Sequence, residues 1–256
     1  MTRLPQIQDA FQSYLLRGDD AVEALVVGTE RVPIATGHPQ ADEVLGGGLR
    51  PGALHEVFAS GWSAGGFAVL LALMAAREKT LFWIRSDYQA MEYGAISPNG
   101  LAELGGDPRH LILLRAKNPA DALCAANDIL ACAHVGAVLL EVEGMPKCLD
   151  LVASRRLAFT AGESGATILL LRNGAQAEPS AALTRWQVAS AQSHSDDDDW
   201  GNPVFAAGLI RHRLGGVGNF LMRWNLQNAC FETADIGAVV STPAGRPAYT
   251  QARRAV

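Results

Sequence analysis

One stretch of the 256-residue chain, residues 47–79, constrains the fold most, and it reads GGLRPGALHEVFASGWSAGGFAVLLALMAAREK. Residues 53–59 have the apolar character of a strand, residues 60–66 (SGWSAGG) are small and flexible, and residues 67–77 are a nearly continuous apolar run. Such a run is typical of a helix buried against a sheet. A strand, a glycine-rich turn and a helix in this order form the layout of a phosphate-binding loop, in which backbone N–H groups surround an anion.

This loop lacks the side chains that bind nucleotide phosphates and magnesium. The phosphate-loop pattern requires Gly, four residues, then Gly-Lys-Ser/Thr. The best register fills those defined positions with Ser60, Gly65, Gly66 and Phe67. A glycine therefore replaces the lysine, and we expect Phe67 to fill the space of the magnesium ion. Because Gly61 permits a tight turn and Ser63 offers a hydroxyl donor, weak nucleotide or anion binding stays open as an alternative.

The composition argues against a protein that binds nucleic acid mainly through its overall charge. The chain is 49% hydrophobic, 18% charged and has a net charge of −5, which leaves only a local basic patch open. No apolar segment near the start predicts a signal peptide, and the longest apolar run, residues 67–76, is far shorter than the ~20 residues that span a bilayer. We expect a soluble, cytoplasmic protein.

Neither the cysteines nor the acidic residues have the spacing of a metal site. The cysteines are scattered, without a CxxC pair, at Cys124, Cys132, Cys148 and Cys230. This pattern favours buried, reduced thiols over metal ligands. The acidic run at 195–199 (SDDDD) indicates a solvated loop. We therefore expect no metal site and no cofactor.

Strand-like and helix-like segments alternate after the glycine-rich loop. Apolar strands are predicted over 80–84, 111–114, 137–140 and 167–171, with helices between them over 97–105, 119–133 and 149–163. Regular alternation is typical of a mostly parallel sheet with helices on both faces. We therefore predict a three-layer α/β fold whose central strands bury Leu139, Leu140, Leu169 and Leu170.

The pattern changes towards the C-terminus. Residues 184–190 and 208–214 alternate like half-exposed antiparallel strands, and residues 219–225 form a third. The Gly-Gly-Val-Gly sequence before the third strand predicts a hairpin turn. The expected organisation is an N-terminal helical segment over 1–30, a core over 31–228 and a flexible C-terminal tail over 229–256.

The two ends of the chain supply candidate partner contacts. An apolar stripe recurs at helical spacing in the N-terminal segment, at Ile7, Phe11, Tyr14 and Leu15. This stripe is compatible with a helix packed on the core or with an arm that docks on a neighbouring molecule. Arg223 and Trp224 close the predicted hairpin and are candidates for contacts at the other end.

From about residue 36 onward, the order of elements resembles the RecA-like core of recombinases. The stretch TGHPQADEVLGGGLRPGALHEVFASG is similar to the lead-in to the phosphate loop of that family. The resemblance implies that Glu141 stands where the Walker B aspartate ends its strand. It places Asp87 near the catalytic glutamate and Asn173 near the polar sensor residue. For both carboxylates, the alternative is a solvated side chain or one that is hydrogen-bonded to a helix N-terminus.

A closer resemblance is to the ImuA family of RecA-like accessory proteins in bacterial damage-induced mutagenesis cassettes. It is carried over about residues 36–228 by GGGLRPGALHEV, the lysine-less SGWSAGGFAVLLAL, DLVASRRLAFTAGESGATILLLRNG, and TRWQVASAQS with the RHRLGGVGNFLMRWN hairpin. ImuA-type proteins are encoded with ImuB, an inactive Y-family polymerase homologue, and an error-prone replicative-type polymerase. The resemblance implies a non-catalytic adaptor in SOS-induced translesion DNA synthesis that contacts RecA and ImuB, with the N-terminal arm docking on RecA or on another copy.

Two other functions stay open beside this adaptor. A residual RecA-family ATPase or DNA-binding protein is disfavoured by the missing lysine, because ATP hydrolysis needs positioning, metal and charge neutralisation together. The loops after the fourth and fifth strands are short, and the arginines near them are expected to be ordinary surface charges: Arg155, Arg156, Arg172 and Arg185. A cell-division inhibitor similar to SulA is the third reading, by analogy of fold.

Overall fold

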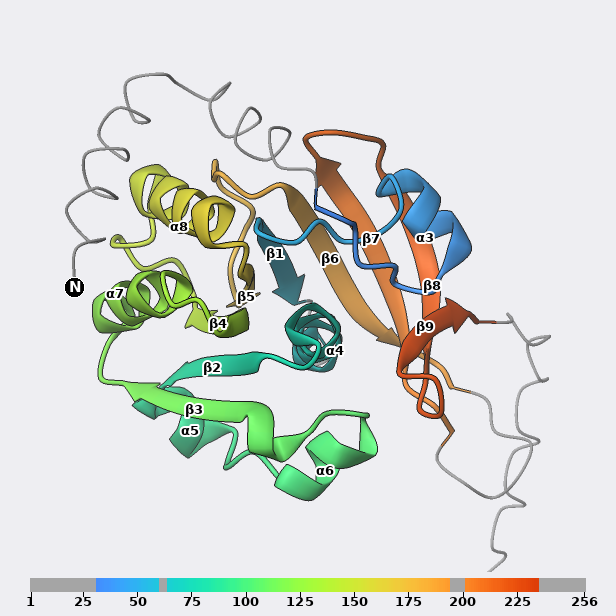
Figure 1. Ribbon diagram of the computed structural model, residues 1–256, viewed down its shortest axis with the longest axis horizontal. Coiled ribbons are helices and arrows are strands. Elements are labelled where there is room, and N and C mark those ends of the chain that lie inside the picture. The colour runs from blue at the N-terminus through green and yellow to red at the C-terminus, as the bar shows by residue number, and fades with distance from the viewer. Residues whose placement is uncertain (1–30, 60–63, 194–200, 235–256) are drawn as a thin grey trace, which may run out of the picture.

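The protein is represented by a computed structural model that describes residues 31–59, 64–193 and 201–234. Within these residues, nine strands form one sheet in the order β3-β2-β4-β5-β1-β6-β7-β8-β9 (Figure 1). The strands are β1 (Leu54–Ala59), β2 (Thr80–Ser86), β3 (Leu111–Ala116), β4 (Val135–Glu143), β5 (Thr167–Asn173), β6 (Thr184–Ala191), β7 (Val204–His212), β8 (Gly218–Asn225) and β9 (Cys230–Thr233). The predicted α/β fold is therefore confirmed.

The helices lie on both faces of the sheet, as the alternation predicted (Figure 1). They are α3 (Pro39–Val44), α4 (Ala64–Ala76), α5 (Asp87–Glu92), α6 (Pro98–Glu103), α7 (Pro119–Leu130) and α8 (Leu151–Ser164), with a short 3-10 turn η1 (Pro108–His110). Side chains of α3, α4 and α6 join the core on one face, and those of α7 and α8 join the core on the other. The helix α4 has no polar face because it is enclosed by the sheet and its neighbours.

The central strands are buried on both faces, which explains their continuous apolar sequence. Leu139, Leu140, Leu169 and Leu170 are all fully buried, as predicted. Successive residues on each strand point to opposite faces, so that Leu139 and Leu169 enter one core while Leu140 and Leu170 enter the other.

The strand β6 corrects one expectation. It pairs parallel with β1, with His55 opposite Thr184, and antiparallel with β7 on its other side. It is therefore an inner strand and largely buried, whereas the sequence predicted a half-exposed antiparallel strand. Its polar residues suggested exposure, but Thr184 and Arg185 are buried and hydrogen-bonded. The predicted hairpin between β7 and β8 is present.

The core also extends past the expected boundary at residue 228. Cys230–Thr233 form β9, which pairs antiparallel with β8. Phe231 is fully buried, and its ring centroid lies 4.9 Å from that of Trp224 and 5.3 Å from that of Phe67. The expectation of a flexible tail from residue 229 onward is therefore wrong for Cys230–Thr233. Residues 1–30 and 235–256, including the N-terminal stripe, lie outside the described part of the chain.

Two further observations concern the cysteines and the membrane. Cys124, Cys132 and Cys148 are exposed and Cys230 is half-buried, so the expectation of buried thiols is wrong. Cys124 lies on the exposed side of α7, and Cys132 and Cys148 lie in the connections that follow α7 and precede α8. No helix in the described ranges has the length and apolar character needed to cross a bilayer.

Candidate functional site

A cavity of about 570 Å³ lies at the carboxyl ends of the central parallel strands. Open α/β sheets place their ligands at this edge. The strands β1, β2, β4 and β5, the start of α4, and the segment through α6 all contribute to the wall. Polar and charged groups in the wall are Arg85, Tyr93, Ser97, Glu141, Glu143 and Asn173. The cavity therefore lies where an open α/β sheet binds its ligands.

The start of α4 corrects the expectation for Phe67. Gly65 and Gly66 line the cavity, but Phe67 is fully buried in the core on another side of the helix. Its ring centroid lies 5.6 Å from both Trp186 and Phe205. Phe67 therefore joins α4 to the C-terminal strands and does not fill a magnesium position in this cavity. Ser60, Gly61 and Ser63 lie outside the described residues.

The Walker-B-like residue Glu141 is buried in an internal ion pair. Its Oε2 accepts a hydrogen bond from Arg85 Nε at 3.2 Å, and its Oε1 accepts one from Trp83 Nε1 at 2.6 Å. Both partners come from the neighbouring strand β2. Burial raises the pKa of Glu141, and the positive charge of Arg85 opposes that rise. The expectation of a solvated carboxylate does not hold for Glu141.

Arg85 is held on three sides. Besides Glu141, its guanidinium donates to the carbonyl of Gly94 at 3.0 Å and to that of Gln89 at 3.3 Å. These contacts connect β2 to α5 and to the segment that follows α5. Because the guanidinium is already bonded to one carboxylate and two carbonyls, it is poorly placed to receive a phosphate. The sequence places Arg85 directly after the apolar run TLFWI, at the ligand-binding end of a predicted strand, but Arg85 was not among the predicted site residues.

Of the other two predicted polar residues, Asp87 and Asn173, only Asn173 lies at the cavity. Asp87 is exposed in the first turn of α5 and does not line the cavity. A carboxylate is favourable at that place because it faces the positive end of the helix. Asn173 is the last residue of β5 and lines the cavity. Its backbone carbonyl accepts a hydrogen bond from the backbone N–H of Gly144 at 2.7 Å.

Sequence analysis did not identify Glu143 and Tyr93, which stand at the rim of the cavity. Glu143 ends β4 and is exposed, and its Oε2 accepts a hydrogen bond from the Tyr93 hydroxyl at 3.3 Å. Partial burial, together with the charge of Glu143, raises the pKa of Tyr93 to about 12. Glu143 alternates with Glu141 along β4, which is the signal that could have placed both at one strand end.

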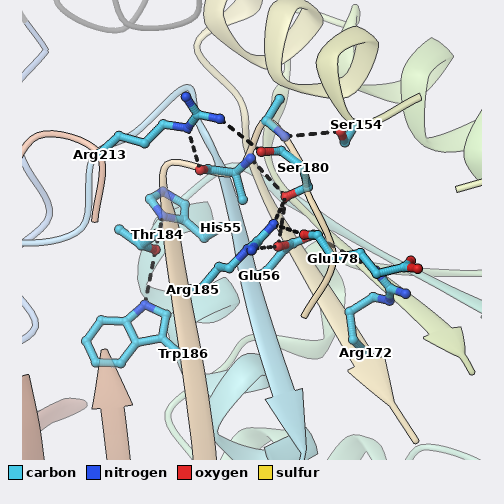
Figure 2. Close-up of polar contacts among 12 residues, drawn as sticks. His55, Glu56, Ser154, Arg172, Glu178, Ser180, Thr184, Arg185, Trp186 and Arg213 are labelled. Carbon is cyan, nitrogen blue, oxygen red and sulfur yellow. Dashed lines mark hydrogen bonds and ion pairs between the residues drawn. The ribbon is translucent and has the colours of Figure 1, made fainter. Parts of the chain in front are cut away.

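A second polar cluster is buried beside the sheet, on the face covered by α8 (Figure 2). Glu56 on β1 accepts a hydrogen bond from Arg185 Nε at 2.7 Å and lies 4.0 Å from Arg172 Nη1. Arg172 and Arg185 are therefore buried ion-pair members, and the expectation that they are surface charges is wrong. Burial lowers the pKa of Arg172, and the charge of Glu56 opposes that change. Arg156 is exposed, as expected, and Arg155 is half-buried.

This cluster fastens the connection between β5 and β6. Ser180 donates to Glu56 Oε2 at 2.9 Å and accepts from Arg185 Nη2 at 2.8 Å, and Arg185 also donates to the carbonyl of Glu178. Arg213 reaches the same connection from the end of β7, where it donates to the carbonyl of Ser180 at 2.9 Å (Figure 2). The end of this connection is thus part of the packed core rather than a free loop.

His55 is a neutral, fully buried residue next to this cluster (Figure 2). Its Nε2 lies 2.8 Å from the carbonyl oxygen of Arg50, which accepts only, so Nε2 carries the proton. The Thr184 hydroxyl accepts from Trp186 Nε1 at 3.1 Å and then donates to His55 Nδ1 at 2.7 Å. Burial lowers the pKa of His55 to about 4.

The structure separates the two candidate contacts on the hairpin. Trp224 is fully buried against Phe231, so it is not available to a partner and that expectation is wrong. Arg223 is half-exposed and forms an ion pair with Glu232 at 3.1 Å, across the β8–β9 pair. Side chains alternate along β8, so Trp224 points into the core and Arg223 points outward.

These features define a class of protein: an α/β protein with a mostly parallel central sheet, a cavity at the carboxyl ends of its strands, and a carboxylate, Glu141, that is buried and paired internally with Arg85. No known protein-family profile matches the chain. The chain is 28% identical over 211 residues to Protein ImuA of Caulobacter vibrioides, in strain NA1000 / CB15N and in strain ATCC 19089 / CIP 103742 / CB 15. Each alignment covers 74% of this chain and 82% of the relative. The chain is therefore similar to an ImuA protein, in agreement with the resemblance found in its motifs.

Proposed function

We propose that the protein is a non-catalytic, RecA-like adaptor in SOS-induced translesion DNA synthesis, where it contacts RecA and ImuB. The observation that carries the proposal is the Arg85–Glu141 ion pair, which engages the carboxylate that a RecA-like ATPase would use near its metal. Gly66 at the lysine position removes the cation that would neutralise the phosphates. The fold is retained while the groups for ATP chemistry are not, which favours a binding role.

The connection between β5 and β6 argues against a major role for this protein in direct DNA binding, because it is held in place by hydrogen bonds. RecA-like proteins bind DNA through loops at this place, but here Ser180 is buried and held by Glu56 and Arg185. Arg185 and Arg213 contact it but are engaged in hydrogen bonds inside the protein, and Arg172 is buried beside Glu56. We therefore assign DNA contact to the partners, and contact by this chain is indirect or weak.

We assign partner binding in part to the two ends of the chain. The apolar stripe of Ile7, Phe11, Tyr14 and Leu15 would dock on RecA or on a second copy, and residues 235–256 would contribute to ImuB binding. Deleting 1–30 should weaken RecA capture or self-association, whereas deleting 235–256 should weaken ImuB capture. If both shortened proteins bind both partners at wild-type strength, the contacts lie on the core.

The experiment that tests the proposal combines ATP turnover with capture. Purified protein should capture RecA and ImuB and should hydrolyse no ATP above a protein-free blank. Thermal melts with and without Mg-ATP should superimpose, because a ligand at 100 times its dissociation constant would stabilise the fold by about 2.7 kcal/mol. Turnover that Glu141→Gln abolishes would favour a residual ATPase. Capture of neither partner would favour a different binding role, such as a SulA-like inhibitor.

A further inference from the structure

The cavity at the carboxyl end of the sheet has an acidic balance. Of the described residues that line it, the charged ones are Arg85, Glu141 and Glu143. Arg85 and Glu141 compensate each other through their ion pair. Glu143 is exposed at the rim and accepts only from the neutral Tyr93 hydroxyl among the hydrogen bonds of the described chain. One carboxylate is thus left to attract a cation.

The start of α4 contributes a positive electrostatic potential, which would favour an anion in the cavity. A helix N-terminus has the electrostatic effect of roughly half a positive charge, and this effect falls off within the first turn. That partial charge is smaller than the full charge of Glu143, and no lysine lines the described wall to add to it. The side chains therefore favour a cationic occupant over a nucleotide phosphate.

The rest of the wall is apolar. It is formed by Val69, Ile96, Leu101, Leu104 and Leu171. Ile96 and Leu104 are only half-buried, so an occupant would remove further apolar surface from water. The volume of about 570 Å³ is that of a site for a small ligand or for two or three side chains.

We infer that this cavity binds a protein segment in which an arginine or lysine stands beside a bulky apolar residue. The cation would pair with Glu143, with the Asn173 amide beside it, and the apolar side chain would pack on Leu101 and Leu104. This inference rests on the proposed adaptor function, because it supplies a partner-binding use for the former nucleotide position. Charge complementarity and the apolar wall together select this occupant.

Capture of RecA and ImuB by full-length variants tests the inference. Glu143→Lys should weaken capture of at least one of them by at least about tenfold, since truncating or reversing one member of an interfacial charge pair removes most of its benefit. Ala95→Trp, at the exposed rim, should block the cavity with a similar loss. Glu103→Lys is the matched control, because Glu103 is exposed on α6 with the same charge but does not line the cavity.

A second arm measures binding directly, by methyl NMR of the full chain. Acetyl-Leu-Arg-Leu-amide at millimolar concentration should shift the methyl signals of Ile96, Leu101 and Leu104, and Glu143→Lys should remove the shifts. Acetyl-Leu-Glu-Leu-amide and ATP should leave those signals in place. Thermal melts of Glu143→Lys and Ala95→Trp show whether either variant has a folding defect. If Glu143→Lys does, the milder Glu143→Gln takes its place.

The outcomes separate the two proposals. If the wild type captures its partners but Glu143→Lys and Ala95→Trp capture them equally well, the cavity inference is overturned and the adaptor function stands. Equal loss with Glu103→Lys, or equal shifts with the glutamate peptide or ATP, also overturns it. If the wild type captures neither partner, the proposed function fails, and the peptide arm alone decides whether the cavity prefers a cation.

Discussion

Arg85 Nε lies 3.2 Å from Glu141 Oε2, and both side chains are buried between neighbouring strands. The carboxylate at the Walker-B-like position is therefore neutralised from inside the protein. A metal ion at this place would have to compete with a guanidinium that three oxygen atoms already hold. This pair therefore leaves Glu141 without a free charge at the edge of the sheet where the cavity lies.

Removing Arg85 should destabilise the protein strongly. Arg85→Met leaves Glu141 as a buried carboxylate without its cation, and we expect the free energy of unfolding to fall by about 3–5 kcal/mol in a urea titration. Arg109→Met is the control, because the Arg109–Asp107 pair is solvent-exposed and its loss should leave the stability close to that of the wild type. Equal stability of the two variants would contradict a structural role for the buried pair.

The same variant should show a specific pH dependence. Burial raises the pKa of Glu141, and Arg85→Met removes the charge that opposes this rise. An acid whose pKa is higher in the folded state binds its proton more tightly there, so its contribution to stability is lost as pH rises through the folded pKa. The deficit of Arg85→Met relative to wild type should therefore grow from pH 5 to pH 8, and a constant deficit would argue against Glu141 as the cause.

Replacing Phe67 should reduce stability without restoring nucleotide binding. Phe67→Thr recreates the hydroxyl of the phosphate-loop pattern, but Phe67 packs against Trp186, Phe205 and Phe231. Loss of a buried aromatic ring costs about 3–5 kcal/mol. Tyr88→Ala, at a 59% exposed aromatic residue, is the control and should be close to wild type. An Mg-ATP-dependent rise in Tm of Phe67→Thr would contradict this assignment.

Two C-terminal truncations should differ sharply. A chain that ends after Ala234 keeps β9, whereas one that ends after Asn228 loses β9 and Phe231. Because Phe231 is fully buried in the aromatic core, the shorter chain should lose at least about 3–5 kcal/mol. Denaturant unfolding of both chains gives the comparison. Similar midpoints would mean that β9 contributes little, and Phe231→Ala tests the same point within the full-length chain.

The sequence predicted the sheet well because its central strands are buried on both faces. Such strands appear as short, uninterrupted apolar runs, and their alternation with helices leaves few topologies. The orientation of Phe67 was not predictable in this way, because a helix that is apolar all round has no polar face to show which side meets which neighbour. The strand β9 was missed because four residues with one large apolar side chain give no periodicity.

The buried ion pairs lay beyond sequence reasoning for a different reason. Arg85 and Glu141 are 56 residues apart, and Glu56 and Arg185 are 129 residues apart, so strand order decides which charges meet. Each pair did leave one local sign, a charged residue inside an otherwise apolar strand. That sign shows that a charge is buried but not which partner compensates it.

His55 should make the protein less stable in mild acid. Its pKa is lowered to about 4 by burial, whereas an unfolded histidine titrates near its model-peptide value of about 6.5. Stability from the neutral side chain is complete above the unfolded value and is lost as pH falls towards the folded one, by about 3 kcal/mol in total. His55→Gln should reduce the loss between pH 7 and pH 5, measured by urea unfolding. His110→Gln is the exposed control, and an unchanged pH slope in His55→Gln would contradict the assignment.

The most direct test of the adaptor account is capture of RecA and ImuB by the protein in the complete absence of nucleotide. The account predicts that immobilised protein, after removal of nucleotide with apyrase, captures both partners as strongly as it does with Mg-ATP added. It predicts this because Glu141 is already paired with Arg85 and Gly66 supplies no cation for the phosphates of ATP. Capture that requires Mg-ATP, or no capture under either condition, would contradict it.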